Sequence, residues 1–292
     1  MVDTVEKIPL KKKKISLAQE VIKRLMRNKM AVAGLVILVV VLLSSLLAPL
    51  LSPYDYATQN YGERFVFPNW AHPFGTDNFG RDILTRVLYG GRYTLFIAFV
   101  VTSIAAVAGA LVGLFAAYFP KSDNILMRTI DIFMGIPQMM MCVSIIAALG
   151  GSMKNMMIAL TITATPEFAR IMRAQVLTLK DQEFVEAARS IGGSNLRIMF
   201  RHILPNALAP IIVQYTLGAV NTILMSASLS FVGMGVQPPT PEWGLMISAG
   251  RAYLRDYWYV AILPGLAIIV ASYALNLLGD GLRDALDPRL KR

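Results

Sequence analysis

Long stretches without a single charged residue constrain this chain more than any other feature of its sequence. Four of them are 22 to 27 residues long, at 30–51, 93–119, 132–153 and 257–279. A helix rises about 1.5 Å per residue, so about 20 apolar residues cross the roughly 30 Å hydrocarbon layer of a bilayer. Each stretch therefore predicts one membrane-spanning helix, and the 55% apolar composition argues against a water-soluble globule.

A fifth apolar segment is longer than one span and less regular. Residues 203–241 are uncharged over 39 positions, and their far end, 233–239, contains glycines and paired prolines that break helices. We therefore expect a helix near 206–230, followed by an external loop or re-entrant piece over 231–256.

The weakest candidate span is 155–166, which has only 12 uncharged residues, short of the roughly 17 that a span requires. The distribution of lysine and arginine favours keeping it. With six spans and an internal amino terminus, 21 basic residues lie inside and 7 outside, as the positive-inside rule requires. The sequence thus predicts an all-α polytopic membrane protein with six transmembrane helices, both termini cytoplasmic, in the cell (inner) membrane.

This topology divides the chain into five parts. They are a cytoplasmic amphipathic segment, a first transmembrane helix, an external loop, a core of five helices and a cytoplasmic tail, at 1–29, 30–51, 52–92, 93–280 and 281–292. Within the first part, apolar residues recur at helical spacing from Leu17 to Met26, as in a helix at the membrane surface. The basic run Lys11–Lys14 is equally consistent with a segment that only fixes orientation.

Several function classes find no support in the residues. The net charge of +10 would suit nucleic acid, but most basic residues fall on inner loops, where anionic lipid explains them, so we expect a lipid bilayer and no nucleic acid as partner. One cysteine and two histidines are too few for an ordinary metal cluster, so no metal site is expected. A membrane enzyme would need a converging nucleophile, base or metal set, which we do not find.

Two local patterns suggest chemistry but have simpler explanations. The glycine spacing of Gly75–Gly80 resembles a phosphate-binding loop, yet Arg81 and Asp82 stand where lysine and serine or threonine should follow. Asp131 is the one acidic candidate for a proton relay near a span. Its spacing from Arg128, three residues earlier, favours a structural ion pair on one helix face.

Methionines cluster around the third and fourth predicted spans. Met139, Met140 and Met141 are candidates for lining a passage, because flexible thioethers tolerate varied substrates, although gap-filling packing is the commoner use of methionine.

The longest inner loop, 177–205, has a mechanical layout. Good helix formers cover 177–191, Gly192 and Gly193 break the chain, and a second helix over 195–204 should end before Pro205. Two short helices that meet at a glycine elbow would form a compact knob between the fourth and fifth spans. Small side chains at Ala187 and Ala188 would let a partner approach, with Glu186 as one charge for register, although an ordinary amphipathic loop fits this bare pattern as well.

Here the sequence resembles a known family, the permease subunits of ABC importers. Their signature is Glu-Ala-Ala, three residues, glycine, then nine residues before Ile-x-Leu-Pro, and this chain has Glu186-Ala-Ala, Gly192 and Leu204-Pro205 at that spacing, with His202 in place of the isoleucine. Longer segments resemble the oligopeptide/dipeptide branch, C-type subunit. These segments are His72–Asp82, Phe231–Gly244 and Asn276–Arg289.

The resemblance implies a subunit that forms half of a translocation path for di- or oligopeptides and does not itself catalyse. Implied partners are a second, B-type permease, two ATP-binding subunits that hold ATP and magnesium, and an external substrate-binding protein. ATPase coupling is implied for Glu186, Ala187, Ala188, Gly192, Gly193, Leu204 and Pro205. Contact with the binding protein or the path is implied for Gly75, Thr76, Asp77, Gly80, Arg81, Asp82, Gly233, Gly235, Pro238, Trp243 and Gly244.

Two alternatives stay open. Importers of nickel chelates, glutathione or another small solute resemble this branch closely, so the solute could differ. An ATP-independent channel or secondary carrier would also fit the spans and charges.

Overall fold

The computed structural model describes residues 17–286, and every regular element in that range is helical, with one isolated bridge between Thr76 and Asp82. The elements of the first half are α1 (Leu17–Leu25), α2 (Lys29–Leu46), α3 (Ala48–Leu51), the 3-10 turn Tyr61–Glu63, α4 (Ile83–Tyr118), α5 (Pro120–Met134) and α6 (Gln138–Leu149). Those of the second half are α7 (Met153–Leu179), α8 (Glu183–Ser190), α9 (Asn195–Ile198), the π-helical turn Met199–Ile203, α10 (Leu204–Phe231), α11 (Trp243–Gly250), the 3-10 turn Arg251–Tyr253 and α12 (Tyr259–Leu286). The all-α class is confirmed.

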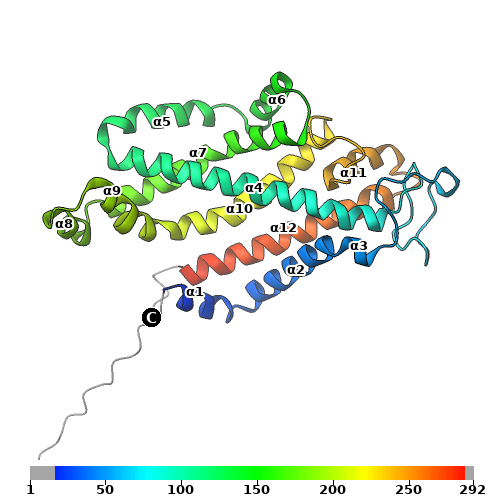
Figure 1. Cartoon of the computed structure of the whole chain (residues 1–292), viewed down its shortest axis with the longest axis horizontal. Coiled ribbons are helices and arrows are strands. Elements are labelled where there is room, and N and C mark those ends of the chain that lie inside the picture. Colours follow the sequence, from blue (N-terminus) through cyan, green and yellow to red (C-terminus); the bar gives the residue numbers. More distant parts are fainter. Residues whose placement is uncertain (1–16, 287–292) are drawn as a thin grey trace, which may run out of the picture.

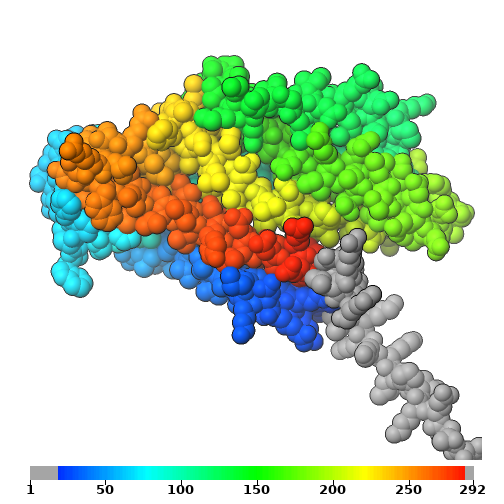
Figure 2. All heavy atoms as spheres, turned by 180° about the vertical axis from the view of Figure 1, so that it is seen from behind, coloured from blue at the N-terminus to red at the C-terminus, as the bar shows by residue number. Residues whose placement is uncertain are grey.

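The long helices lie along one axis of an elongated bundle (Figure 1). One end carries α8 and α9, together with α1 and the last turn of α12; we call it the α8 end. The opposite end carries the long loop after α3 and the short helix α11; we call it the α11 end. Seen from behind, α12 covers the middle of the molecule between α2 and α10 (Figure 2).

Four helices in the described range are long and apolar enough to cross a membrane: α2, α4, the continuous stretch Asn195–Phe231, and α12. They contain four of the six predicted spans. The pair α5 and α6 makes a fifth only if it is taken as one broken span, because the two helices meet at 92°. The structure thus supports four or five spans by length and composition.

The third predicted span, 132–153, is wrong as a single helix. Its first residues belong to α5, and the chain turns at Gly135–Pro137 before α6 begins. Proline restricts the residue before it, Ile136, away from helical geometry, which places the break here. We expected Asp131 to pair with Arg128 on the same helix, but its partner is Arg170 on α7. Asp131 Oδ1 lies 2.8 Å from Arg170 Nη2.

The weak candidate 155–166 is part of α7, a helix of 27 residues with Pro166 inside it. At about 1.5 Å per residue α7 is about 40 Å long, which is enough to cross a bilayer. Its charged residues, including Glu167 and Arg170, keep it below the apolarity of the four clear spans.

The second span begins ten residues earlier than hydropathy predicts. Asp82 caps α4, because its Oδ1 accepts a hydrogen bond from the backbone N–H of Thr85 at 2.7 Å. Arg86 and Arg92, which end the uncharged stretch, are hydrogen-bonded to backbone carbonyls of other segments. The two arginines on the first turns of the helix are therefore paired with groups from other segments. Helix α4 runs for 36 residues, about 54 Å.

Helices α4 and α7 pack backbone against backbone through Gly109 and Gly113. A Cβ at Gly113 would lie 2.2 Å from the Ala169 carbonyl oxygen, and one at Gly109 would lie 2.6 Å from that of Thr165. This small-xxx-small spacing lets two membrane helices approach closely. Close packing makes α4 and α7 one stiff unit between the two ends of the bundle.

The helix after the inner loop does not end before Pro205, contrary to our expectation. Proline lacks an N–H and would clash with the carbonyl one turn earlier, so the preceding turn widens. The N–H of Leu204 donates to the Met199 carbonyl, five residues back, and α10 continues from there. One helical rod therefore connects the inner loop to the span.

Candidate functional site

The predicted inner loop, 177–205, forms a knob at the α8 end of the bundle, where α8 projects beyond the ends of the long helices (Figure 1). The predicted helix 177–191 is divided, since α7 ends at Leu179 and α8 begins at Glu183. Val185 and Ala188 are the buried residues of α8. They belong to a buried apolar cluster that also contains Ile198 and Met199, and α8 lies against α9 and the π-helical turn. The same cluster extends to Val176 of α7 and Leu114 of α4, so apolar packing connects the knob to the α4–α7 unit.

A tight turn after α8 sets the direction of the chain into α9. Gly192 has φ of +79°, a left-handed conformation that favours glycine, and its N–H donates to the Arg189 carbonyl at 3.0 Å. The N–H of Gly193 donates to the Ala188 carbonyl at 3.0 Å, and a Cβ at Gly193 would lie 2.6 Å from that oxygen. Both glycines of the predicted elbow are therefore required by geometry, for two different reasons.

The surface of the knob exposes large apolar side chains among its charged residues. Four large hydrophobic side chains are exposed on it: Phe184, Ile191, Leu196 and Phe200. Ile191 is 87% exposed, the most of the four. Of the residues predicted here, Glu186 and Ala187 face outward beside this patch, whereas Ala188 faces the core; at the base, Leu204 is half-buried and Pro205 exposed.

At the α11 end, the segment around Asp77 folds around its own charges. Asp77 Oδ2 lies 2.7 Å from Nη2 of Arg81 and 3.6 Å from Nε of Arg86, while Asp77 Oδ1 accepts hydrogen bonds from the N–H groups of Phe79 and Arg81. Gly75 and Gly80 have positive φ, which permits the two turns that flank Asp77. The charged residues are buried, so their first role is to hold this segment together.

Asp82 connects the same segment to α4. Its Oδ2 lies 3.0 Å from Nδ1 of His72, and its Oδ1 accepts from the N–H and Oγ1 of Thr85. Thr76 is fully buried, and its Oγ1 accepts from the N–H of Val66 at 2.8 Å. The loop 52–82 is thus a fixed structure on the first turns of α4.

The two predicted external segments meet at these first turns of α4. Arg86 Nη1 donates to the carbonyls of Tyr56 and Pro239, at 2.7 and 3.5 Å. Trp243, 1% exposed, donates from Nε1 to the Val87 carbonyl at 2.9 Å. Sequence reasoning placed the segments on one side of the membrane but did not predict that they join.

The residues that make this junction possible were missed in the sequence. Gly90 leaves room for the second segment, since a Cβ there would lie 2.1 Å from the Pro241 carbonyl, and Gly91 leaves room for Ser45 of α2. This glycine pair was predicted to lie in the external loop 52–92, just before the predicted span at 93–119. A glycine pair next to a span was the available signal, because glycine permits close approach of another backbone.

Glu242 is the other missed residue, a fully buried carboxyl group at the start of α11. Its Oε2 accepts from the N–H of Leu245 at 2.8 Å, and Thr94 Oγ1 lies 3.5 Å from its Oε1. Burial raises the pKa of this carboxyl group above its usual value, because the charged form is deprived of water. A buried N-cap next to Trp243 anchors α11 to α4.

The remaining predicted residues of the external segments divide by exposure. Gly235 and Gly244 are buried against Ser230 and Ala227 of α10, whereas Gly233 and Pro238 are exposed. The surface that a partner could reach at this end therefore consists of the exposed turns rather than of the charged core beneath them.

The methionine cluster is split in the same way. Met139 and Met140 are exposed on α6, and Met141 is buried.

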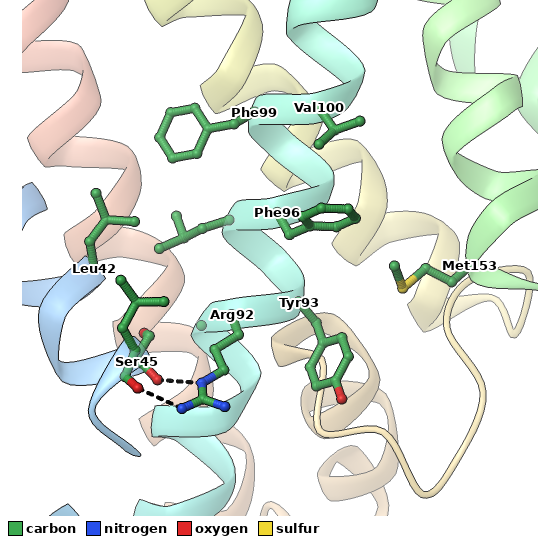
Figure 3. A pocket seen from close by; sticks show the side chains of 11 residues that line it. Leu42, Ser45, Arg92, Tyr93, Phe96, Phe99, Val100 and Met153 are labelled. Atoms are coloured by element: carbon green, nitrogen blue, oxygen red, sulfur yellow. Dashed lines mark hydrogen bonds between the residues drawn. The ribbon is translucent and has the colours of Figure 1, made fainter. Parts of the chain in front are cut away.

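A separate cavity of about 720 Å³ opens between α2 and α4, next to Met153 (Figure 3). Its walls are apolar apart from Ser45, Tyr93 and Arg92, whose guanidinium donates from Nε and Nη2 to the carbonyls of Ser45 and Leu46. The Arg92 guanidinium is thus occupied by the last carbonyl groups of α2, so this cavity is poorly suited to a charged or polar solute.

Comparisons with known proteins agree with this architecture. The family described as binding-protein-dependent transport system inner membrane component matches residues 109–292, and the N-terminal transmembrane domain of oligopeptide transport permease C matches residues 16–69. A putative peptide transport system permease protein of Brucella abortus is 45% identical over 269 residues, which are 92% of this chain and 91% of the relative.

A second relative is the dipeptide transport system permease protein DppC of Escherichia coli K12. It is 43% identical over 273 residues, 91% of each chain. A chain of the inward-facing MetNI methionine ABC transporter has the same fold, with a TM-score of 0.58 at 21% identity over 69% of this chain and 96% of that one. The chain therefore belongs to the family of binding-protein-dependent transport system inner membrane components, the membrane-spanning permease subunits of ABC transporters.

Proposed function

We propose that this chain is the C-type permease subunit of an ATP-driven importer of di- and oligopeptides, and that it forms half of the translocation path. Two of the relatives above are named as peptide or dipeptide permeases, and both match the chain over about nine-tenths of its length. Its partners are a second, B-type permease, two ATP-binding subunits that hold ATP and magnesium, and an external substrate-binding protein.

The observation that carries this proposal is the knob at the α8 end. Its apolar residues Phe184, Ile191, Leu196 and Phe200 are exposed although α8 itself is held by a buried core. A rigid element with an uncovered apolar face fits a cleft on a partner protein. We assign that partner as the ATPase, with Glu186 and Ala187 at the contact and Gly192, Gly193, Leu204 and Pro205 setting the angle of the knob.

The length of α4 allows it to transmit motion from the α8 end of the bundle to the α11 end. Its inner turns, at Leu114 and Ala117, pack in the same core as α8, and its outer turns hold Trp243 and the loop 52–82. A push on α8 would therefore move the α11 end as part of one body rather than bend the bundle. Such rigid-body motion between inward- and outward-open states couples ATP closure to transport.

We place the α8 end in the cytoplasm and the α11 end outside, because 21 of 28 basic residues then fall inside. Six crossings of the inner membrane follow if α5 with α6 counts as one broken span and α7 as another. The exposed turns near Gly233 and Pro238 would then face the binding protein, held by the buried residues Gly75, Thr76, Asp77, Gly80, Arg81, Asp82, Gly235, Trp243 and Gly244. Met139 and Met140 would line the path.

The test is to tag this chain, extract it gently from its native membrane and identify the proteins that copurify, with ATP hydrolysis and peptide uptake assayed after reconstitution. We expect a second permease, ATPase chains and ATP-dependent uptake of labelled dipeptide. If metal chelates inhibit uptake and peptides do not, the transported solute is a metal chelate rather than a peptide. Transport by the chain alone without ATP would refute the importer.

A further inference from the structure

A chain of side-chain amides crosses the bundle near the break between α5 and α6. Asn221 of α10 donates from Nδ2 to Oε1 of Gln138 at 3.2 Å, and Gln138 donates from Nε2 to Oγ1 of Thr163 at 3.4 Å. Thr163 is ten residues from the start of α7, which is about 15 Å along the helix and about half the thickness of the hydrocarbon layer. Asn221 is exposed, so these polar groups border an open surface at membrane depth.

An exposed ion pair lies two turns further along α7, toward the α8 end. Arg170 Nη2 contacts Asp131 Oδ1 at 2.8 Å, and the side chains are 53% and 61% exposed. Arg128 and Glu167, three residues earlier on the same faces of α5 and α7, are exposed as well. Charged side chains are costly within the hydrocarbon layer of a bilayer, so this face is suited to water or a polar ligand rather than to lipid.

A second ion pair on the same two helices is bidentate and less exposed. Arg173 contacts Asp123 through two parallel hydrogen bonds, from Nε and Nη2, each 2.7 Å long. Its side chains are only 33% and 25% exposed. This bidentate pair holds α5 on α7, so the Asp131–Arg170 pair is not required for that purpose.

The Asp131–Arg170 pair keeps unused binding capacity. Within residues 17–286, its single contact leaves the second carboxylate oxygen of Asp131 and the Nε and Nη1 groups of Arg170 without a protein partner. A carboxylate can accept an ammonium group, and a guanidinium can bind a carboxylate. The pair can therefore receive either charged terminus of a peptide.

The spacing between the amides and the ion pair sets a length. Thr163 and Arg170 are seven residues apart on α7, which is about 10.5 Å. Three extended residues span about 10–11 Å. A tripeptide with one terminus on the ion pair would thus reach Gln138 and Asn221 with its main-chain amides.

From this geometry, and resting on the peptide importer proposed above, we propose that Asp131, Arg170, Gln138 and Asn221 form a binding track for short peptides in transit. Amide side chains both donate and accept, so they pair with any peptide bond regardless of sequence. The ion pair binds a charged terminus, which all unmodified peptides have. The track would therefore admit short peptides with little regard to their side chains.

The first test uses the complete importer with its partner chains in liposomes, supplied with ATP and labelled trialanine. Asp131→Asn combined with Arg170→Gln should lower the initial uptake rate about tenfold, the effect of one lost charge-assisted hydrogen bond. ATP hydrolysis stimulated by loaded binding protein should persist. The matched control, Glu20→Gln with Arg24→Gln, removes an ion pair on α1 that is outside the proposed track and should keep wild-type uptake per assembled complex.

The second test measures access and does not depend on altering the pair. Arg128→Cys places a thiol one turn from Asp131, and the native Cys142 is fully buried. A positively charged, water-soluble methanethiosulfonate should react with the new thiol, and trialanine should slow the reaction. Lys121→Cys, exposed on α5 but about 15 Å from Asp131, should react at a rate that trialanine does not change.

The outcomes separate the two proposals. Wild-type uptake of trialanine with an unaffected Asp131–Arg170 double variant overturns the track alone, as does a thiol at 128 that is unreactive or insensitive to trialanine. Failure of the wild-type importer to transport trialanine overturns the proposed function and the track together.

Discussion

The substitution Gly113→Ala tests whether α4 and α7 form one stiff unit. A Cβ at this position would lie 2.2 Å from the Ala169 carbonyl oxygen and 2.9 Å from the Arg173 nitrogen. Both atoms belong to the backbone of α7, so no side chain can rotate away. The two helices would have to separate by several tenths of an ångström along their contact.

The magnitude follows from two opposing effects. Overpacking a close interface costs about 1–3 kcal/mol, and a backbone clash belongs at the upper end. Alanine is favoured over glycine within a helix by about 1 kcal/mol. We therefore expect a net loss of about 2 kcal/mol in the free energy of unfolding, which lowers the melting temperature by about 4–8 °C.

The assay is thermal unfolding of the purified chain in detergent, followed by intrinsic fluorescence, beside Gly265→Ala as a matched control. Gly265 lies within α12, where the nearest atom to a Cβ would be 4.0 Å away, so this variant should melt at or above the wild-type temperature. A Gly113→Ala protein that melts with or above the wild type would refute the close-packed unit.

Three further predictions concern the two ends of the bundle. Gly192→Ala meets no atom within 4 Å but holds φ at +79°, so it should lose about 1–2 kcal/mol of stability, measured by thermal unfolding. Because burial raises the pKa of Glu242, the folded chain binds the proton of this carboxyl group more tightly than the unfolded chain does. The free energy of unfolding should therefore fall as the pH rises above 4.5. Glu242→Gln should lack this dependence in melting curves recorded between about pH 5 and about pH 8. Trp243→Phe leaves the Val87 carbonyl without its donor and should cost about 1–3 kcal/mol in the same assay; an unchanged melting temperature would contradict the anchor.

The sequence predicted the parts of the fold that depend on local apolarity. The spans near 30–51, 206–230 and 257–279 correspond to α2, α10 and α12, since uninterrupted hydrophobic runs determine them. A turn at Gly192 was also predictable, because a left-handed conformation after a helix favours glycine.

Other features depend on contacts between distant segments, which periodicity does not reveal. The early start of α4 depends on carbonyl partners for Arg86, and the partner of Asp131 proved to be a residue 39 positions away. The break at Gly135–Pro137 did carry a local signal, which the uninterrupted hydropathy of 132–153 concealed. The junction of the two external segments and the roles of Gly90 and Glu242 emerge only from the packed structure.

We propose that α8 couples ATP hydrolysis by the partner chains to peptide import. The most direct measurement compares ATP-dependent uptake of a labelled dipeptide by the reconstituted importer with and without the paired substitutions Glu186→Ala and Gly192→Val. Valine at a positive φ and the loss of the exposed carboxylate should abolish uptake while the chain remains in the membrane at wild-type levels. Uptake at the wild-type rate in this variant would show that α8 does not couple ATP hydrolysis to import.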